Sequence, residues 1–560
     1  MARFILIDNS LEAVGGHHYQ FARDVLEAAA SRGMEGVLVT HRRFWRYNDL
    51  PSDWLVLPLF QHSGYSPHAV CLGGGADGPV DEHGRPLCLE TRASRGWWER
   101  WRQGNRERQR QRYLRAYELT LASAFRRLGI FHDDLILFAT ASDFDLLGLV
   151  RYLRSDPRTK IATWHLQFHF NLLEGRENEH ERQADRLTTA RSQLDRARAL
   201  VPQHRLRYYC TTESLARQYR RIGLEPMQEL PYPSNPRLAA RIDHDEIPER
   251  FQVTCAGGLR REKGKGCFQS LIEQLEEHPL AERLKIFVQS GRRLRWSRDR
   301  TARLVELIVA RHPLNSEQYA KLIRTSDVGL FLYDGRRYAT RCSGVLVEML
   351  SAGIPVIVPP ACWLSDQLAS AQTLWMDRLA RRYRDLPFQS AAHAEARWAW
   401  PDDAAQALVE IEANEPFPPG VHGEFAAKSE SADAPPALSI FRCEQAPVRL
   451  LVDRPEHARE LSVSLRGAFA EPLPPLARVR CRFLPSRGER AEPHGVVGLS
   501  AADPWQIPRL LAEMARHYAH YRQSAEAFAE GWRQQHDPRR VVDLLATEAA
   551  QTPPSSVRAA

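Results

Sequence analysis

The sequence predicts an α/β protein with two doubly wound parallel sheets. Short apolar, β-branched runs alternate with helical segments, and they do so in two separate blocks of the chain. This alternation is typical of parallel strands that helices cover on both faces. A Pro-rich stretch between the blocks indicates a hinge. The two domains are therefore expected to face each other across a cleft.

The first block covers residues 1–235. It opens with RFILI at 3–7, which predicts a strand, and continues through a loop into a helix that Gly33 ends before the strand VLVT. The predicted hinge ELPYPSNPR lies at 229–237. Strands and helices recur between these points at 134–154, 160–168 and 208–223.

The second block, residues 245–412, carries the strand-like runs FQVTCA, LKIFVQS, DVGLFLY and IPVIVP. Residues 413–500 begin with a linker rich in Pro, Ala, Glu and Ser. They continue in short β-like runs, which predict a small inserted β module. The segment 501–547 returns to helices, and we assign it to the second domain.

Composition limits the classes of function. The formal net charge is +8, but only six of the 77 basic residues are lysines, so arginine is the ordinary cation of this chain. No nucleic-acid module accompanies the charge. The nine cysteines have no paired spacing, no long apolar run is present, and MARFILIDNS lacks the layout of a signal peptide. We expect a cytoplasmic protein that binds neither nucleic acid nor, without CxxC or HExxH motifs, a metal ion.

The first of three motifs that indicate a ligand site is VGGHH. Gly15 and Gly16 would let the backbone approach a ligand at a helix amino end, where negative charge is favoured. His17 and His18 follow directly. Two interpretations stay open for this pair: one histidine contacts substrate, or both are exposed.

The second motif is AGGLRREKG, after the strand FQVTCA. Gly258 frees the loop, while Arg260 and Lys263 can reach a diphosphate, because a planar guanidinium and a compact ammonium both suit phosphate oxygens. Positive charge near a helix amino end is unfavourable unless an anion binds there. We therefore predict a phosphate-binding loop rather than a solvated basic turn.

The third motif is YATRCSGVLVEMLSAGIPVIVP at 338–359. Ser343 and Gly344 would offer backbone N–H groups to a phosphate, and Glu348 should lie toward the same side of the helix. The neighbours of Glu348 are apolar, so the helix should be buried, and a buried acid needs a partner. A carboxylate here can accept hydrogen bonds from two ribose hydroxyls.

The stretches VGGHHYQFA, GGLRREKG and RCSGVLVEMLSAGIPVIVP together resemble the GT-B glycosyltransferases, most nearly glycosyltransferase family 4. The resemblance covers about residues 1–410 and the final helices. It implies two Rossmann-like domains, with a nucleotide sugar held mainly by the second and an acceptor held mainly by the first. It also implies transfer without a metal ion, and final helices that cross back to the first domain.

The resemblance also implies roles for single residues on the phosphate side. Lys263 matches the family's phosphate-binding lysine. The arginine usually found five residues earlier is Gly258 here, so Arg260 would take its place. His165, after the strand KIATW, is placed like the family's histidine that reaches the donor sugar.

On the sugar side, the family has two glutamates spaced eight apart. Glu348 matches the second, which holds the ribose, but the first position is Thr340. Tyr338 and Arg341, on either side of Thr340, would supply the missing donor contacts.

These residues predict a hexosyltransferase that moves a sugar from a nucleoside-diphosphate sugar to a glycan or lipid-linked acceptor, in surface polysaccharide or glycoconjugate synthesis. His165, Arg260 and Lys263 would be catalytic, with no cofactor, and the cations would stabilise charge on the leaving phosphate. One alternative is a nucleotide-sugar epimerase or a phosphorylase on a related fold. Another is a non-catalytic sugar-nucleotide-binding scaffold.

Three further patterns have structural interpretations. Ser142 and Asp145 predict a helix capping box rather than a DxD metal motif. His165 and His169 are four apart but lie in a strand and loop, so they do not predict zinc. The basic, aromatic segment 95–117 is either a helix at the inner face of the cytoplasmic membrane or an exposed helix that packs on the first domain.

Overall fold

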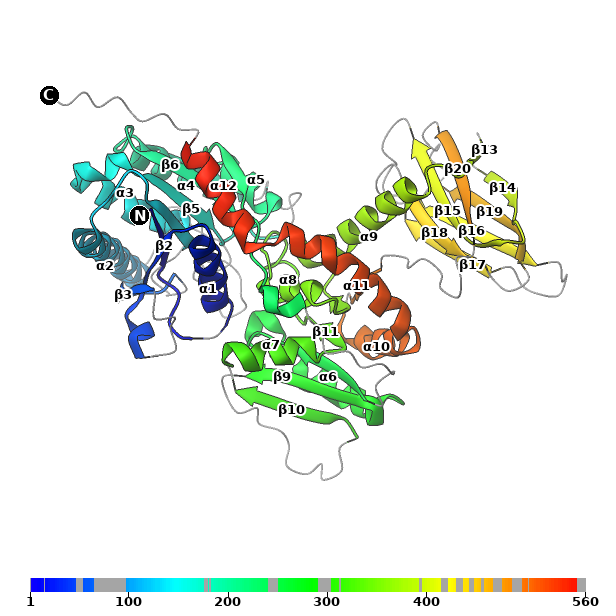
Figure 1. The fold of residues 1–560 in the computed structure, drawn as a ribbon. Helices are drawn as coiled ribbons and strands as arrows, with labels where there is room; N and C mark the ends of the chain where they lie inside the picture. Colours follow the sequence, from blue (N-terminus) through cyan, green and yellow to red (C-terminus); the bar gives the residue numbers. More distant parts are fainter. Residues whose placement is uncertain are drawn as a thin grey trace. The chain divides into compact units, whose positions relative to one another are not determined.

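The chain folds into two compact units in a computed structural model (Figure 1). The first unit comprises Met1–Asp366, Gly498–Tyr518 and Ala529–Ala560, and the second Gln367–Val497 and Ala519–Phe528. The structure describes residues 2–14, 16–46, 54–64, 97–175, 180, 183–239, 250–290, 304–311, 314–391, 395–413, 422–429, 437–442, 448–454, 458–466, 476–485, 496–501 and 503–550.

The first unit begins with a seven-stranded parallel sheet in the order β3-β2-β1-β4-β5-β6-β7. Its strands are β1 (Arg3–Asp8), β2 (Glu35–His41), β3 (Leu55–Phe60), β4 (Leu135–Ala141), β5 (Thr163–Phe168), β6 (Arg205–Cys210) and β7 (Met227–Glu229). Its helices are α1 (Gly16–Ser31), α2 (Trp97–Leu128), α3 (Asp143–Ser155), α4 (Ala184–Arg198) and α5 (Glu213–Arg220). The strand order reverses between β1 and β4.

Aromatic side chains fill the core of this first domain. Trp164 of β5 is fully buried, and its ring lies edge-on to Phe125 of α2 and Tyr152 of α3, at centroid distances of 5.1 and 6.1 Å. The capping box is confirmed, because Ser142 Oγ accepts from Asp145 N while Asp145 Oδ2 accepts from Ser142 N. Tyr113 of α2 also donates to Asp145, at 2.5 Å. The cap therefore ties α3 to α2.

The first unit contains a second parallel sheet, in the order β10-β9-β8-β11-β12-β21. Its strands are β8 (Phe251–Cys255), β9 (Leu284–Ser290), β10 (Glu306–Arg311), β11 (Val328–Leu330), β12 (Val356–Val358) and β21 (Gly498–Ser500). Its helices are α6 (Phe268–Glu276), α7 (Ser316–Arg324), α8 (Gly344–Ser351) and α10 (Ile507–Arg516). The order reverses between β8 and β11. The two sheets confirm the predicted pair of doubly wound domains.

The last helices, α11 (Tyr518–Gln535) and α12 (Pro538–Ala550), return toward the first domain. At the end of α11, Trp532 Nε1 donates to the carbonyl of Val347 in α8, at 3.1 Å. Helix α12 then packs beside α1, where Asp543 pairs with Arg32 at 2.6 Å. The predicted crossing-back of the final helices is thus present.

The second unit holds a β-sandwich of two antiparallel four-stranded sheets, β13-β20-β15-β18 and β14-β19-β16-β17. A core of apolar side chains from both sheets, among them Trp398, Leu461 and Val409, lies between them. The strands are β13 (Gln389–Ala391), β14 (Glu395–Ala399), β15 (Ala404–Ala413), β16 (His422–Ser429), β17 (Ala437–Arg442), β18 (Val448–Asp453), β19 (Ala458–Arg466) and β20 (Leu476–Pro485).

The sandwich differs from the predicted module at both ends. It begins at β13, so residues 389–412, which the sequence assigned to the second Rossmann-like domain, supply three of its strands. Part of the predicted linker is strand β16. At the other end, residues 498–500 form β21, which pairs with β12 instead of with the module. Local alternation identifies a strand, but only its pairing decides its sheet.

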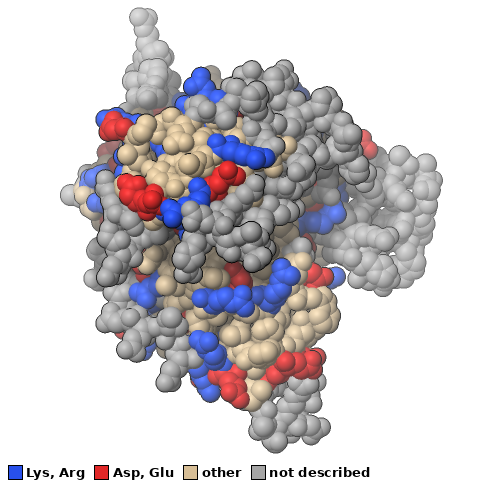
Figure 2. Space-filling view, turned by 90° about the vertical axis from the view of Figure 1, so that its right-hand side faces the viewer, with Lys and Arg blue, Asp and Glu red and all other residues tan. Residues whose placement is uncertain are grey.

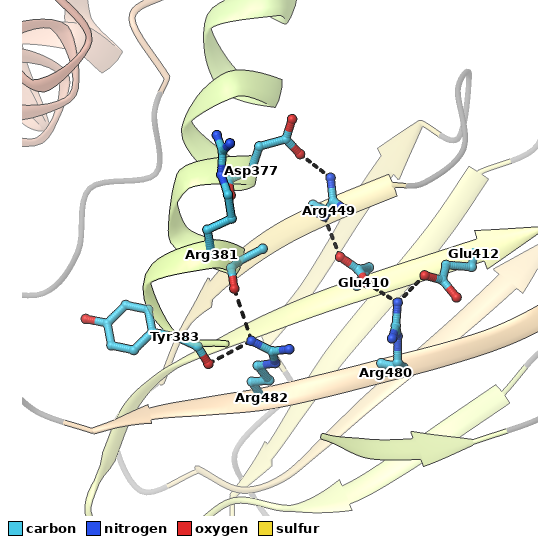
Figure 3. A network of polar contacts seen from close by, with 9 residues as sticks. Asp377, Arg381, Tyr383, Glu410, Glu412, Arg449, Arg480 and Arg482 are labelled. Carbon is cyan, nitrogen blue, oxygen red and sulfur yellow. Dashed lines mark hydrogen bonds and ion pairs between the residues drawn. The ribbon is translucent and has the colours of Figure 1, made fainter. Parts of the chain in front are cut away.

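Helix α9 (Trp363–Arg382) joins the sandwich through its C-terminal half. Met376, Leu379 and Tyr383 pack against apolar side chains on the outer face of the β15-containing sheet. Figure 3 shows a chain of alternating charges beside this contact, formed in order by Asp377, Arg449, Glu410, Arg480 and Glu412.

The buried Arg482 differs from these ion pairs, because its Nη1 donates to the carbonyls of Ala380 and Tyr383, at 3.1 and 2.7 Å. These carbonyls lie at the C-terminus of α9, where a cation is favoured. The guanidinium also lies 3.5 Å from the ring centroid of Phe388. Arg482 therefore anchors the end of the helix to β20.

The segment 95–117 falls mostly on α2, and residues 95 and 96 and the side chains of 97–107 lie outside the described residues. From Tyr113 onward the helix packs on α3 in the first domain, with Tyr113 and Tyr117 buried. Membrane contact through the first residues of the segment 95–117 stays a prediction. No helix within the described ranges is long and apolar enough to cross a membrane. Figure 2 shows lysine and arginine side chains in a row across the middle of one face.

We predict that Arg482→Ala destabilises the second unit. It would leave two helix-terminal carbonyls without their donor, which should lower the free energy of unfolding by about 2–4 kcal/mol. Urea unfolding followed by hydrogen exchange in β15 and β20 measures the change. Arg478→Ala is the matched control, since Arg478 lies on the same strand with its side chain 55% exposed. Equal stabilities of the two variants would contradict the anchoring role.

Candidate functional site

The first half of the site is the loop that follows β8. It ends in the short helix η6 (Arg261–Lys263), and the Lys263 Nζ atom lies 4.8 Å from the ring centroid of Tyr333. Gly257 has a φ of +86°, and a Cβ there would lie 3.1 Å from Lys263 Nζ. Gly264 has a φ of +82°, and a Cβ there would lie 2.2 Å from Leu332 Cβ. The glycines therefore let the lysine fold back over the strand ends.

Gly258 and Arg260 belong to the same loop. Gly258 has a φ of +59°. The Arg260 side chain is 46% exposed and lies 3.7 Å from Glu262, so it remains able to turn toward a ligand. The predicted phosphate loop thus has one partly enclosed cation, Lys263, and one exposed cation, Arg260.

The second half of the site is α8 and the loop before it, which starts at the end of β11. Ser343 is the N-cap of α8, and its Oγ accepts from the Leu346 N–H at 3.3 Å. A Cβ on Gly344 would lie within 2.7–2.8 Å of the Tyr232 ring. Only glycine therefore allows the start of α8 to pass beside the hinge residue Tyr232.

Glu348 is 2% exposed, as the sequence predicted for this helix face. Its partner is the Tyr319 hydroxyl of α7, which donates to Glu348 Oε2 at 2.5 Å. Burial raises the pKa of Glu348 to about 7, against the lowering effects of this hydrogen bond and of Lys263. Burial therefore disfavours the ionised form of Glu348.

Lys263 is perturbed in the opposite direction. Burial of the ammonium group lowers the pKa of Lys263 to about 7, and repulsion by Arg260 and Arg341 adds to this, while Glu262 and Glu348 act against it. Lys263 and Glu348 are therefore two ionisable groups of opposite charge type whose pKa values meet near neutrality. Such perturbed groups are typical of functional sites.

Tyr338 and Arg341 lie on the loop between β11 and α8. The Tyr338 ring is buried with its centroid 4.5 Å from that of Tyr333, and the Arg341 guanidinium carbon lies 5.8 Å from the Tyr338 centroid. Arg341 also lies 5.6 Å from the ring centroid of Phe170, in the first domain. Arg341 therefore contacts both Rossmann-like domains.

Thr340 docks this loop onto the first domain. Its Oγ1 donates to Asn171 Oδ1 at 3.0 Å and accepts from Gln218 Nε2 at 3.3 Å. Its carbonyl accepts from Thr212 Oγ1 at 2.6 Å. The position that is a glutamate in the resembling family thus serves a contact between the two domains here.

A polar cluster lies at the carboxyl edge of the first sheet. Asp8 ends β1, and its Oδ2 atom is 3.0 Å from His18 Nδ1 in α1. Burial acts to raise the pKa of Asp8, but the charge and hydrogen bond of His18 lower it below its usual value. Burial also lowers the pKa of His169, just after β5, to about 3, assisted by repulsion from His18 and Arg341.

The structure brings most of the predicted site residues together in the second domain. Gly16 starts α1, whereas Gly15 lies outside the described residues. His165 lies apart, because it is the third residue of β5 and is buried within the sheet, with Nδ1 3.0 Å from the Tyr209 hydroxyl. The residues gathered around β8, β11 and α8 are Gly258, Arg260, Lys263, Tyr338, Arg341, Ser343, Gly344 and Glu348.

Three residues of the site were not predicted. Tyr319 and Tyr333 contact Glu348 and Lys263, and Asp24 of α1 approaches Glu348 from the first domain. Asp24 accepts from Gln20 at 2.6 Å, and burial, with the like charge of Glu348, raises its pKa well above the usual value. No sequence pattern marks these residues, because each meets its partner from a separate element.

A cavity of about 420 Å³ lies beside the cluster, at the carboxyl ends of β11 and β12. Apolar side chains such as Phe331, Ile357 and Ile507 line it, and Tyr333 belongs to both the cavity wall and the charged cluster. In the part of the chain that the structure describes, no three potential metal ligands lie together.

Comparison with known proteins returns solved structures only. No protein-family model matches the chain, and neither does any curated protein. WaaG, a glycosyltransferase involved in lipopolysaccharide biosynthesis, is 14% identical over 66% of this chain and 84% of its own, with a TM-score of 0.36. An α,α-trehalose-phosphate synthase (UDP-forming) from Burkholderia vietnamiensis is 13% identical over 66% and 86%, with a TM-score of 0.41.

The sucrose-phosphate synthase tll1590 from Thermosynechococcus elongatus is 14% identical over 66% of this chain and 84% of its own, with a TM-score of 0.39. The two doubly wound domains of the expected GT-B fold are confirmed by the sheet orders themselves. Membership of family 4 stays a prediction.

We predict that Glu348→Gln reduces the sensitivity of stability to pH. The folded-state pKa of Glu348 is about 7, above the ordinary 4.5, so the unfolded chain loses this proton first as the pH rises. The free energy of unfolding of the wild type should therefore fall as the pH rises through the range between these two pKa values. That of the variant should rise relative to the wild type by up to about 3 kcal/mol.

Urea unfolding at about pH 5 and about pH 8 measures this difference. Glu317→Gln, at an exposed acid of α7, is the matched control and should follow the wild type. If Glu348→Gln also follows the wild type at both pH values, the raised pKa of Glu348 is wrong.

Proposed function

We propose that this protein is a metal-independent GT-B glycosyltransferase of the hexosyltransferase type. It moves a sugar from a nucleoside-diphosphate sugar to a glycan or lipid-linked acceptor, in surface polysaccharide or glycoconjugate synthesis. One observation carries the proposal: Arg260 and Arg341 act on Lys263, and Lys263 acts on the buried acid Glu348, where the order of the second sheet reverses. Ligands of open parallel sheets bind at such reversal points.

The cations suit a diphosphate. Arg260 and Arg341 both lower the pKa of Lys263, which means that the three groups repel one another. A dianion bound among the three cations would attract each of them and so offset their mutual repulsion. It would also raise the pKa of Lys263. Because guanidinium and ammonium groups differ in geometry, the set can bind both ends of a diphosphate.

Glu348 suits the ribose. It is buried beside the phosphate loop, and one of its oxygens already accepts from Tyr319. An ionised carboxylate has further acceptor capacity for ribose hydroxyls. Binding of a dianion next to Lys263 would keep that lysine protonated, which in turn favours the ionised form of Glu348.

The reaction needs this arrangement when the bond between sugar and phosphate breaks. Negative charge then grows on the leaving nucleoside diphosphate, and preorganised cations stabilise it. Arg341 contacts Phe170 in the first domain and Tyr338 in the second, so it can join the donor to an acceptor held by the first domain. An epimerase would instead convert the donor without an acceptor.

Thermal unfolding with UDP, GDP, ADP and their sugar conjugates, with and without EDTA, tests the proposal. A ligand that binds only the folded state raises its stability with the logarithm of concentration over Kd. We expect a shift with one nucleoside diphosphate that EDTA leaves unchanged and that Glu348→Ala weakens by about 1.5–3 kcal/mol of binding free energy. No shift with any of them would favour the scaffold, and conversion of the donor sugar alone would favour the epimerase.

We predict further that Lys263→Ala weakens binding of the nucleoside diphosphate much more than binding of the nucleoside. The variant would lose a charge-assisted contact to phosphate worth about 1.5–3 kcal/mol, and only the diphosphate has the phosphate groups that make this contact. Lys265→Ala is the matched control, because Lys265 is exposed two residues further on and should leave both affinities unchanged. Equal losses for nucleoside and diphosphate would remove Lys263 from phosphate binding.

A further inference from the structure

The cavity at the carboxyl ends of β11 and β12 is a separate feature from the proposed donor site. None of the described residues that we assign to the donor lines it. Its walls include Cys267, at the start of α6, and Ile507, the first residue of α10. Its volume of about 420 Å³ lies within the range of small-molecule pockets, roughly 300–1,000 Å³. The cavity is therefore large enough for a ligand of its own.

The cavity has a buried apolar floor and an exposed mouth. The floor consists of apolar side chains that are at most 4% exposed, which are those of Phe331, Ile357 and Ile507. The mouth consists of exposed residues, which are Asp334, Arg336 and Ala361. Ala361 has a φ of +59°, a left-handed conformation that side chains rarely adopt and that is typical of ligand sites. A ligand can thus enter from solvent and reach an apolar floor.

The polar side-chain groups of the walls are directed elsewhere. The Tyr333 hydroxyl lies beside the loop after β8, since a Cβ on Gly257 would be 3.9 Å from it. The Cys267 Sγ atom donates to the carbonyl of Gly264 at 3.3 Å. The charged side chains of the lining belong to the mouth. A sugar placed on the floor would lose hydrogen bonds to water, whereas a hydrocarbon chain has none to lose and gains from leaving water.

The mouth borders the first domain. Gly175, in the segment after β5, belongs to the lining, and its N–H donates to the carbonyl of Arg336 at 3.4 Å. Asn171 Nδ2 of the same segment donates to the carbonyl of Arg337 at 3.1 Å. A molecule whose chain lies in the cavity therefore has its polar headgroup beside the first domain, which is the acceptor side of the proposed function.

One short segment, 332–334, separates the cavity from the proposed donor phosphates. Leu332 lies in the cavity wall and packs against Gly264 of the loop after β8, where a Cβ would be 2.2 Å from Leu332 Cβ. The ring of Tyr333 also lines the cavity, and Lys263 Nζ lies 4.8 Å from its centroid. A chain in the cavity and a diphosphate on Lys263 would thus lie on opposite sides of the same segment.

We propose that this cavity holds the hydrocarbon chain of a lipid-linked acceptor, so that the acceptor is an amphiphile rather than a free glycan. The inference rests on the proposed function and names the class of its acceptor. The floor buries the part of the chain next to the headgroup, and the mouth places the headgroup at the border with the first domain.

The first test is calorimetric titration of the full-length protein with alkyl phosphates from butyl to decyl, each below its micelle concentration. We expect the affinity to rise roughly fourfold with each added methylene until the cavity is full, because each methylene leaves water. Inorganic phosphate should not compete, since the chain supplies the affinity. UDP, GDP and ADP should not displace decyl phosphate, because the donor binds on the other side of the segment 332–334.

The second test changes the size of the cavity. Ala501 belongs to its lining, so the ring of Ala501→Phe should fill part of it and lower the affinity for decyl phosphate about tenfold. Ala501→Ser is the matched control at the same position and should bind like the wild type. Both variants should keep the wild-type affinity for the nucleoside diphosphate.

A third measurement needs no variant, and it decides the matter if Ala501→Phe does not fold. Decyl phosphate with a diazirine at the chain tip should label wild-type peptides that contain Phe331, Ile357 or Ile507. Affinity independent of chain length, equal affinities of the two Ala501 variants, or labelling confined to other peptides would each overturn the proposal. Labelling of α2 alone would indicate contact with a membrane surface instead.

Displacement of decyl phosphate by a nucleoside diphosphate would also overturn the proposal, because it would assign the cavity to the donor. All of these outcomes leave nucleotide binding by the wild type intact. Failure of the proposed function is distinguishable from them, because then no nucleoside diphosphate stabilises the wild type.

Discussion

The docking of the β11–α8 loop on the first domain is the contact on which the rest of the site depends. Thr340 makes it through Asn171, Gln218 and Thr212, and all four side chains are buried. Buried polar groups need their partners, so this set of hydrogen bonds favours one position of the loop. The next residue, Arg341, is thereby held between Phe170 and Tyr338.

The charges of the site are poorly compensated in the protein alone. Lys263 and Glu348 both have pKa values near 7, because burial penalises the charged form of each and their mutual attraction does not make up for it. Such perturbed pairs are typical of functional sites, and burying a charged group costs free energy that a surface position does not. A diphosphate and a ribose would supply the opposite charge and the hydrogen-bond donors that the cluster lacks.

The β-sandwich has a hydrophobic core that is separate from those of the parallel sheets. Its core is made by its own two sheets, and α9 covers one outer face through apolar contacts and Arg482. Beside this contact, Arg449 and Arg480 alternate with Asp377, Glu410 and Glu412 in one row of ion pairs. The module thus has a core of its own, and the parallel pairing of β12 with β21 is kept on either side of it.

Local patterns in the sequence determined the alternation of strands and helices, the Ser142 cap and the glycines of the loop after β8. Each depends on residues close in the chain, where backbone geometry and burial periodicity act. The same holds for the burial of Glu348, since a helix with apolar residues on all sides must be enclosed.

Only the tertiary structure decided which strands pair and which side chains meet. The short strand β21 joins β12, and residues 389–412 join the sandwich, because hydrogen bonds between distant segments select the sheet. Tyr319 reaches Glu348 only because α7 packs beside α8. His165 lies inside β5 whereas His169 lies just beyond its end, so the position of the strand end, set by sheet pairing, separates a buried core histidine from one at the site.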